Sequence, residues 1–476
     1  LRFWITQPTT SAEGFSYYRD YSNIKVYGGG KIFVNFTAPA TGVVNGRGSM
    51  FMLDDNTNGF EASDLDILIA EGCFINNFTL GCIHQITESS VSNIVIDRVK
   101  IHQEPKADNA LGITGINFFR DTADPLDIKE NSNILIRDCD IKLYGNGGYG
   151  INMLRKCVGV QVLNCSVILV ASTDDNNDSY NAIGIYGDSE YVLIDGCTAQ
   201  SGHSPIAMSM SKKGAITNNK VFNVMYGETN ITESGIEVEY KAGHGDATLE
   251  TYGVVISGNY VEHCQRGISL FERAVSATTI APYEVIIANN IVKDCSIVDI
   301  CVGLGNSTVV TTNPIRDFII TGNICKSVGG LGIRVYQGKD FTITNNILEG
   351  QNYGIMLGRN TVMQATGTAI ITGNKMKNIV NHSMRIETAV DINLLFANNI
   401  MDGGLYGLFL NHASNVNGLS TIQVANNMAK NIVIIGGGIV GLCSAYYLHK
   451  EGHQVTIIDK GDFSSGASFV NAGYVT

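Results

Sequence analysis

A short phrase recurs about every 30 residues through most of this chain, and this periodicity constrains the fold more than any other feature. The phrase is a run of β-branched and other apolar residues, then one or two small or polar residues, and then Cys or Asn. Its clear copies end at the following residues: Cys139, Cys165, Cys197, Asn219, Asn259, Asn290, Asn323, Asn346, Asn374, Asn399 and Asn427. Such self-similarity predicts a stack of like units, each contacting only its neighbours.

A second phrase, Gly-Ile or its equivalent, follows most copies after nine or ten residues. Examples are Gly267-Ile268, Gly332-Ile333 and Gly354-Ile355. The apolar residues do not follow helical spacing, and the chain has 53 glycines but only 16% charged residues, against about 25% in ordinary globular proteins. The pattern therefore predicts that each repeat forms two or three short, well-buried strands joined by Gly and Asn turns.

Stacking explains why either Asn or Cys occupies the last position of the phrase. Coils of short strands that stack about 4.8 Å apart pair every backbone group with the next coil. Asn side chains in register can then hydrogen-bond along the stack, and Cys is small and apolar enough for the same position. We therefore predict that Cys139, Cys165 and Cys197 are buried ladder residues and not metal ligands.

The alternation of Ile-x-Ile-x-Gly-Asn with Gly-Ile resembles the right-handed parallel β-helix proteins of the pectin-lyase-like superfamily. The resemblance covers about residues 20–427 and implies an all-β solenoid of about 13 coils. Many of these proteins, including pectin and pectate lyases, polygalacturonases, epimerases and phage tailspikes, act on polysaccharides. It therefore implies a polysaccharide or cell-surface glycan as partner, a homotrimer if the chain is tailspike-like, and an extracellular or virion location. The fold alone does not choose among these activities.

Composition excludes several other classes of protein. The net charge of −12 argues against a nucleic-acid partner, whose phosphates need a basic surface. The sequence has no apolar run of about 18 residues, so we expect no membrane span. It has 11 cysteines but no CxxC pair, and the acidic stretch 174–178 lacks the pattern of a calcium loop. We expect no metal.

Catalytic residues are predicted on one strand of the solenoid. If Ile236, Val238 and Tyr240 face inward, then Glu237, Glu239 and Lys241 face outward. Carboxylates two residues apart on a strand have Cα atoms about 6.5–7 Å apart, near the separation that inverting glycosidases use. Repulsion between them would raise one pKa and suit a general acid.

Substrate-binding residues are predicted near this pair and on later coils. His244 and Asp246 follow in a glycine-flanked loop that could fold over the glutamates. The same register turns further polar side chains outward: Arg334, Tyr336, Arg385 and Glu387. Arg334 lies three coils from Glu237, about 14 Å away, so the two could contact successive sugars but not one bond.

Three alternatives to hydrolysis of a polysaccharide by Glu237 and Glu239 stay open at this point. β-Elimination at a uronic acid would need a base and a cation, for which Lys241, Arg273, Arg334 and Tyr336 are available. The glutamates could instead form a solvated strand face with no catalytic role. The whole solenoid could be a non-catalytic fibre or adhesin.

The sequence changes character from Met428. Residues 431–435 form an apolar run typical of a buried parallel strand, and a GxGxxG motif follows with Gly436, Gly438 and Gly441. A helix, a second strand and Asp459 come next. In this arrangement the glycines approach a pyrophosphate and the acid holds a ribose hydroxyl. The pattern predicts a dinucleotide-binding βαβ unit.

This segment is similar to the start of FAD-dependent D-amino-acid dehydrogenases and glycine-oxidase-like flavoenzymes. Residues 468–473 match their Ser-x-x-Asn-Ala-Gly segment, so the resemblance implies that Ser468 and Asn471 lie near the flavin. Two strands and one helix leave apolar faces uncovered, so we do not expect this unit to hold FAD by itself. Besides a polysaccharide-cleaving β-helix and a non-catalytic fibre or adhesin, the third functional hypothesis is a flavin oxidoreductase. A cytoplasmic or membrane-peripheral location would go with it.

The sequence thus predicts a lead-in at 1–22, a β-helix at 23–427 and an incomplete FAD-binding unit at 428–476. The chain starts at Leu1 without a signal peptide, so we expect a truncated lead-in. Residues 426–433 read both as the end of a coil and as the start of a flavoenzyme, with no linker between. This indicates two open reading frames joined at a short shared stretch, with a functional two-part protein as the alternative.

Overall fold

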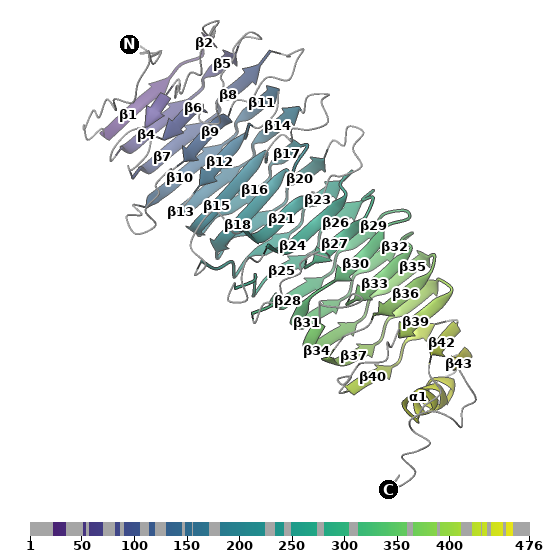
Figure 1. Cartoon of the computed structure of the whole chain (residues 1–476). Helices are drawn as coiled ribbons and strands as arrows, with labels where there is room; N and C mark the ends of the chain where they lie inside the picture. The colour runs from purple at the N-terminus through teal and green to yellow at the C-terminus, as the bar shows by residue number, and fades with distance from the viewer. Residues whose placement is uncertain are drawn as a thin grey trace, which may run out of the picture.

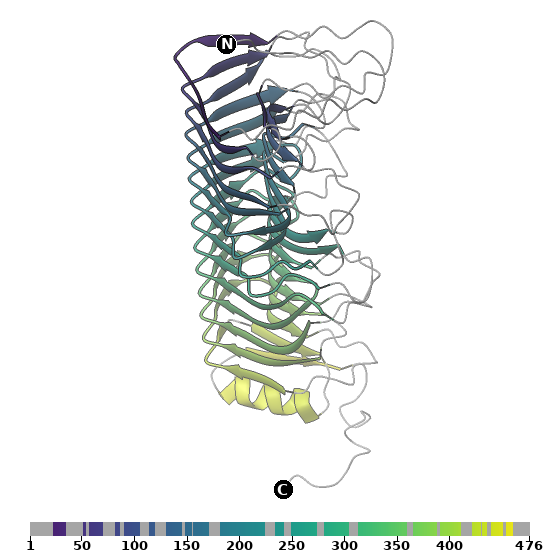
Figure 2. The ribbon, with the colours of Figure 1, turned by 90° about the vertical axis from the view of Figure 1, so that its left-hand side faces the viewer.

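The computed structural model describes twenty segments of the chain. They are residues 22–34, 51–53, 57–69, 81–85, 90–104, 114–119, 130–144, 148–154, 156–170, 181–223, 234–241, 249–273, 280–303, 313–358, 365–387, 391–410, 421–429, 431–435, 439–450 and 454–459. Almost all of them form short parallel strands that wind into one elongated solenoid (Figure 1). The stacked coils are seen in Figure 2.

Each described coil contributes one strand to each of three parallel stacks, except the last coil, which contributes to the first two only. The first stack contains β1 (Ser22–Tyr27), β4 (Asn58–Ser63), β7 (Ser92–Asp97), β10 (Asn131–Arg137), β13 (Cys157–Leu163), β16 (Leu193–Asp195), β19 (Ala215–Thr217), β22 (Val255–Ser257), β25 (Ile286–Ala288), β28 (Arg316–Thr321), β31 (Gly338–Thr344), β34 (Ala365–Thr372), β37 (Asp391–Ala397) and β40 (Thr421–Ala425).

The second stack is a separate sheet of 14 strands. It contains β2 (Lys31–Val34), β5 (Asp66–Ile69), β8 (Lys100–Gln103), β11 (Asp140–Tyr144), β14 (Ser166–Val170), β17 (Thr198–Ser201), β20 (Lys220–Asn223), β23 (Tyr260–Glu262), β26 (Ile291–Lys293), β29 (Ile324–Lys326), β32 (Ile347–Glu349), β35 (Lys375–Ile379), β38 (Ile400–Gly403) and β41 (Met428–Ala429).

The third stack joins the first in one 27-stranded sheet, because the end of its strand β15 pairs with β13. It contains β3 (Phe51–Leu53), β6 (Gly81–Gln85), β9 (Thr114–Phe119), β12 (Ile151–Leu154), β15 (Ile183–Glu190), β18 (Ile206–Lys212), β21 (Ser234–Lys241), β24 (Arg266–Arg273), β27 (Val298–Val302), β30 (Leu331–Val335), β33 (Tyr353–Leu357), β36 (His382–Ile386) and β39 (Tyr406–Leu410).

The interior is a set of apolar columns that run along the solenoid. In the first stack, Ile256, Ile287, Ile320 and Ile343 lie directly over one another and are fully buried. Burial of one such side chain stabilises the fold by about 1.5–3 kcal/mol. The repeated β-branched phrase of the sequence therefore forms the core, and the predicted all-β solenoid is confirmed.

An asparagine ladder follows the turn between the first and second stacks. From Asn219 to Asn427, each side-chain amide donates to the Oδ1 atom of the equivalent Asn in the next coil at 2.9–3.0 Å. Cys139, Cys165 and Cys197 continue the same column as buried free thiols. The backbone N–H of Cys197 donates to Asn219 Oδ1 at 2.8 Å, so the predicted ladder role of the cysteines is confirmed.

The residue before each ladder Asn adopts a left-handed conformation. Gly322 has φ = 66°, Asn345 has φ = 56° and Gly373 has φ = 69°. Gly and Asn tolerate this region better than other residues do. The Gly-Asn and Asn-Asn dipeptides of the sequence therefore mark the same sharp turn, coil after coil.

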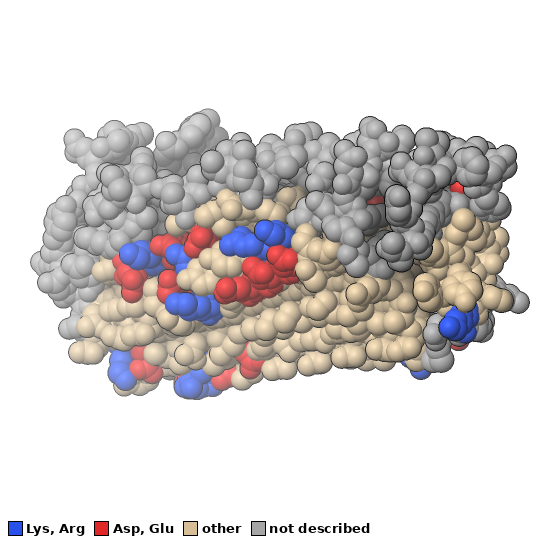
Figure 3. Space-filling model, turned by 90° about the horizontal axis from the view of Figure 1, so that it is seen from below, with Lys and Arg blue, Asp and Glu red and all other residues tan. Residues whose placement is uncertain are grey.

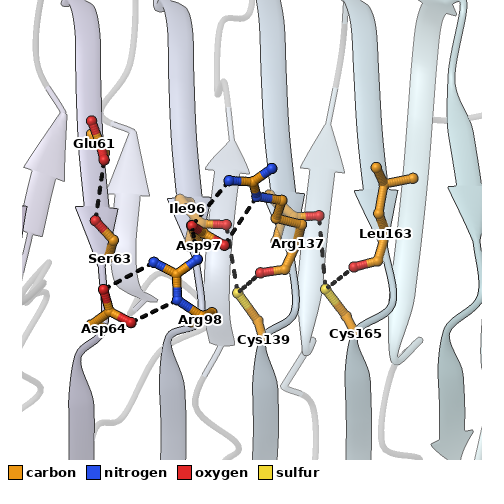
Figure 4. A network of polar contacts seen from close by, with 11 residues as sticks. Glu61, Ser63, Asp64, Ile96, Asp97, Arg98, Arg137, Cys139, Leu163 and Cys165 are labelled. Carbon is orange, nitrogen blue, oxygen red and sulfur yellow. Dashed lines mark hydrogen bonds and ion pairs between the residues drawn. The ribbon is translucent and has the colours of Figure 1, made fainter. Parts of the chain in front are cut away.

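Charged side chains of the first stack gather toward the N-terminus, although Arg316, Asp317 and Lys339 lie further along it, on β28 and β31. Figure 3 shows Lys, Arg, Asp and Glu together on that half, whereas the visible described surface of the other half is mostly uncharged. Buried Asp97 accepts hydrogen bonds from Arg98 and Arg137, and Arg98 also donates to Asp64 (Figure 4). These ion pairs join three successive coils, so the charges serve the fold.

The C-terminal unit lies at the end of the solenoid. It consists of β42 (Asn431–Ile435), α1 (Ile439–Lys450) and β43 (Gln454–Ile458), and the two strands are parallel. Strand β42 lies beside β39, and Ile434, Ala445 and Leu448 pack with Val424 of the last coil. The unit thus covers part of the end of the solenoid, which would otherwise present unpaired strand edges.

We expect Leu448→Ala to loosen this unit without affecting the coils. Leu448 is buried in its small core, and such a truncation costs about 2–5 kcal/mol. Limited proteolysis should release the segment around residues 431–459 faster than in the unsubstituted chain. Leu442→Ala is the matched control, because Leu442 on the same helix is 42% exposed. Equal protease resistance of the two variants would contradict the packing.

Two details differ from the sequence-based prediction. The second stack has 14 strands, against about 13 predicted coils. The coil also continues past the predicted boundary at 427, since Met428 and Ala429 pair with Ile400 and Met401 of β38. Among the helices of the described segments, none is long and apolar enough to cross a membrane.

Candidate functional site

The polar residues predicted to act on substrate lie on the outer face of the third stack. Strand pairing places Glu237, Ser269, Cys301 and Arg334 in one column, followed by Met356, Arg385 and Phe409. The neighbouring residues Ile236, Ile268 and Ile333 belong to the core. Strict alternation therefore turns this column away from the core, as predicted.

Glu237 and Glu239 form the first patch of this face, on β21. They are only 1% and 2% exposed, so the alternative of a solvated strand face is wrong. Ser204 Oγ donates to Glu237 Oε2 at 2.7 Å, and Ser234 Oγ donates to Ser269 Oγ at 2.7 Å beside it. The pair of carboxylates lies in a buried environment lined by hydroxyl groups.

An apolar patch comes next along the same face. Phe271, Val298 and Cys301 are buried and pack with Leu331 and Tyr336. These residues belong to β24, β27 and β30 or follow β30 directly, and they point away from the main core. A buried apolar cluster on an outer strand face separates the carboxylates from the basic residues that follow.

The third patch brings together the four later residues predicted from the sequence. Glu387 forms an ion pair with Arg385 Nη2 at 2.8 Å and accepts a hydrogen bond from Arg334 Nη2 at 3.4 Å. The guanidinium of Arg334 lies 4.2 Å from the centre of the Tyr336 ring. Arg334 and Glu387 are each 7% exposed, so the outward register predicted from the sequence does not leave these two side chains open to solvent.

Aromatic rings flank this patch on β33, β36 and β39. The ring of His382 stacks between Tyr353 at 5.3 Å and Tyr406 at 5.1 Å, and it meets the edge of Phe409. Arg385 lies 5.3 Å from the Tyr353 ring. Burial, and then the positive charge of Arg385, lower the pKa of His382 to about 4, so its imidazole is neutral at pH 7.

Not every predicted residue can be placed. Lys241 ends β21 and pairs with Arg273, but the side chains of both lie outside the described parts of the chain. His244 and Asp246 lie outside the described residues as well. The structure thus brings together Arg334, Tyr336, Arg385 and Glu387. Glu237 lies three coils from Arg334, as the spacing predicted, and five coils from Arg385.

Sequence reasoning missed a buried acid inside the solenoid. Asp299 is fully buried and occupies the position that Gly267 and Gly332 hold in neighbouring coils. Ser327 Oγ donates to its Oδ1, and Gln351 Nε2 donates to its Oδ2 at 2.8 Å. Burial raises its pKa to about 7. The signal was available, since Asp interrupts the Gly-Ile phrase at Asp299-Ile300.

Ser204, Tyr353 and His382 were also missed. They precede the Gly-Ile position or lie in a turn, where the strand alternation gives no direction for the side chain. Within the described segments, no group of three or more His, Cys, Asp and Glu side chains could hold a metal ion. The acidic stretch 174–178 lies outside those segments.

The C-terminal unit has the order expected for dinucleotide binding. Ile435 pairs with Ile458, so Asp459 follows β43 at the edge where α1 starts after β42. Gly441 lies in the first turn of α1. Asp459 and Gly441 therefore fit the ribose and pyrophosphate end of FAD. Gly436, Gly438, Ser468 and Asn471 lie outside the described residues, and FAD binding stays a prediction.

Comparison with protein families agrees with this two-part organisation. A model described as a right handed beta helix region matches residues 152–315, and a model described as FAD dependent oxidoreductase matches residues 431–476. The chain contains a right-handed parallel β-helix followed by a segment similar to the FAD-binding start of D-amino acid dehydrogenases.

The curated relatives match only this C-terminal segment. D-amino acid dehydrogenase of Helicobacter pylori is 55% identical over 49 residues, which is 10% of this chain and 12% of the enzyme. The enzyme of Vibrio atlanticus is 55% identical over 47 residues, 10% of this chain and 11% of the enzyme. The chain spans about an eighth of the length of the relatives it matches.

Solved structures with a similar course cover most of the solenoid. The A-module of Azotobacter vinelandii mannuronan C-5 epimerase AlgE6 has a TM-score of 0.48 at 12% identity, covering 84% of this chain and 91% of that chain. The Streptococcus pneumoniae adhesin PfbA has a TM-score of 0.42 at 13% identity, covering 84% and 92%. The tailspike of E. coli bacteriophage HK620, solved with a pentasaccharide, has 0.44 at 14%, covering 93% and 72%.

Proposed function

We propose that the β-helix binds a polysaccharide along the outer face of its third stack and cleaves it at Glu237 and Glu239. The observation that carries this proposal is the sequence of patches on one face. Carboxylates, an apolar cluster and an arginine–aromatic cluster follow one another from β21 to β39. Six strand spacings separate these ends, about 29 Å, which is the scale of a short oligosaccharide.

The chemical types on this face suit sugars. Partly exposed rings such as Tyr353 and Tyr406 offer flat apolar surfaces to the C–H faces of a sugar ring. Arginine and glutamate supply charged donors and acceptors for hydroxyl groups. The second stack differs, since its outer face carries scattered exposed ion pairs such as Lys326–Glu349.

The glutamate pair would supply general acid and base catalysis. Two buried carboxylates on one strand face cannot both ionise easily, so one would hold a proton for the leaving oxygen while the other activates water. Ser204 holds one oxygen of Glu237 in place. Abstraction of a sugar proton by the ionised partner, which leads to elimination, is the other route open to the same pair.

We expect Glu237→Gln and Glu239→Gln each to lower the cleavage rate by at least about 100-fold, because positioned acids and bases contribute about 10²–10⁴. The assay measures new reducing ends on a panel of acidic and neutral polysaccharides. Ultraviolet absorbance of an unsaturated sugar would identify elimination. Glu349→Gln is the control, since Glu349 lies on the second stack. Full activity in both site variants would refute the assignment.

The near-complete burial of both glutamates favours a second candidate, which is binding without cleavage. In this candidate the role of Glu237 and Glu239 is structural, and their contacts hold β18, β21 and β24 together. In that case the polysaccharide panel would show retention of the protein but no new reducing ends. Glu237→Gln would then change thermal stability and leave binding unchanged.

A further inference from the structure

The arginine cluster of the third stack carries more positive than negative charge. Arg334 and Arg385 share a single carboxylate, that of Glu387, so the three side chains sum to +1. Arg334 and Glu387 are buried, while the Arg385 side chain is 22% exposed. A guanidinium held away from water needs a counter-charge, and the two arginines have only one between them.

Hydrogen-bond donors of the cluster are also left over. Arg334 uses Nη2 on the carbonyl of Gly358 at 3.1 Å and on Glu387, and Arg385 uses Nη1 on the Tyr353 hydroxyl at 3.4 Å. Within the described part of the chain, the buried Nε atoms of both arginines and Nδ1 of His382 have no hydrogen-bond partner. Buried Nε–H donors without acceptors are costly, and this cost adds to that of the uncompensated positive charge.

The neighbouring segments of the sequence do not supply the missing carboxylate. The stretches that follow β27, β33, β36 and β39 are residues 304–312, 359–364, 388–390 and 411–420, and none of them contains Asp or Glu. The chain as a whole carries −12, so a net positive cluster stands against its general charge. The excess charge is therefore a local property of β30 and β36.

Aromatic walls shape the surroundings of the arginines for a ring that bears an anion. Tyr336, Tyr353 and Phe409 lie 4.2–5.6 Å from a guanidinium carbon as measured to their ring centres. All three rings are partly exposed, and the side chain of Arg385, which lies near Tyr353 and Phe409, is 22% exposed. Because the imidazole of His382 is neutral at pH 7, it does not change the net charge of the cluster.

We propose that Arg385, which is partly exposed and is backed by the buried charge of Arg334, binds an anionic group of a sugar unit, so that the polysaccharide this face takes is acidic. The inference rests on the proposed function and deepens it by naming the substrate class. Planar guanidinium groups bind carboxylate and sulfate in two-pronged fashion, and the two sources share this chemistry. The anionic group of the ligand would neutralise the positive charge that Glu387 alone does not compensate.

The test is an array that pairs acidic polysaccharides with neutral counterparts. Polygalacturonate, alginate and hyaluronan are printed beside their carboxyl-reduced forms, and dextran sulfate is printed beside dextran. We expect the unsubstituted chain to bind at least one acidic member at least ten times more tightly than its neutral counterpart. Preference for the carboxylated or for the sulfated members identifies the source of the anion.

Substitutions locate the effect on the cluster. Arg385→Gln should lower binding of the acidic member at least tenfold and leave any binding of the neutral member unchanged, whereas Arg385→Lys should lose less. Arg137→Gln on the first stack, where Arg137 pairs with Asp97, is the matched control and should not change binding. Circular dichroism and the unfolding midpoint check that each variant is folded.

Each outcome separates this inference from the proposed function. Equal binding of acidic and neutral members would overturn the acidic substrate class and leave polysaccharide binding intact. Acidic preference that survives in Arg385→Gln and in Arg334→Gln would overturn the placement of the subsite. Binding to no member of the array would overturn both.

Discussion

Replacement of Asn346 by leucine is expected to destabilise the solenoid by about 4 kcal/mol. Asn346 lies inside the ladder, where its Nδ2 donates to Asn374 Oδ1 at 2.9 Å and to the carbonyl of Ile320 at 3.0 Å. Its Oδ1 accepts from the backbone and the side chain of Asn323 at 3.0 and 2.9 Å. Leucine makes none of these bonds, and each buried group left without a partner costs about 1–3 kcal/mol.

The matched control for this ladder prediction is Asn346→Cys. Cysteine occupies the equivalent position at Cys165 and Cys197, where the Cys165 N–H donates to Cys197 Sγ at 3.4 Å. We therefore expect cysteine to cost about half as much as leucine. Urea unfolding followed by circular dichroism measures both, with the midpoint as readout because long repeat arrays need not unfold in one step. A leucine variant as stable as the cysteine variant would show that the ladder bonds contribute little.

Replacement of Asp299 by asparagine is expected to stabilise the protein at pH 8 by as much as about 4 kcal/mol. Asp299 is fully buried, and burial raises its pKa to about 7 from an unfolded value near 3.9. The folded state therefore binds the proton more tightly than the unfolded state does. This contribution to stability is complete below about pH 4 and is lost as the pH rises to 7 and beyond.

Asparagine is neutral at every pH and has the same shape, so it removes this dependence. The amide can accept from Gln351 and donate to Ser327, the two partners of the present carboxyl group. The measurement is the difference between the unfolding midpoints of the variant and the unsubstituted chain at pH 5 and pH 8. Asp294→Asn is the control, since the Asp294 side chain in the same coil is 49% exposed. A difference that stays the same at both pH values would contradict the account.

The fold was readable from the sequence because stacking repeats one environment many times. Most coils have a left-handed turn residue and then Asn or Cys, so Gly-Asn recurs where the ladder runs. The first coils were harder to count, because Val99 and Leu65 replace Asn and Cys in the same column and are buried there. Apolar residues at that position do not distinguish a turn from a strand.

For the candidate site, the sequence predicted only which way the side chains point. Alternation along β30 and β36 correctly turned Arg334 and Arg385 away from the core, and register placed them on one face. It could not show that Arg334 and Glu387 would be buried, because what packs over an outward side chain comes from elsewhere in the chain. Asp299 was missed for a related reason, since a single Asp in an apolar strand reads as an outward residue.

The most direct test of the proposed polysaccharide-binding face is hydrogen exchange with and without the tightest acidic oligosaccharide from the array. We expect slower exchange in β30, β33, β36 and β39 of the third stack, together with β21, and no change in β26 and β29 of the second stack. Slower exchange confined to the second stack, or to α1 and β43, would contradict this expectation and move the binding site away from Arg334 and Arg385.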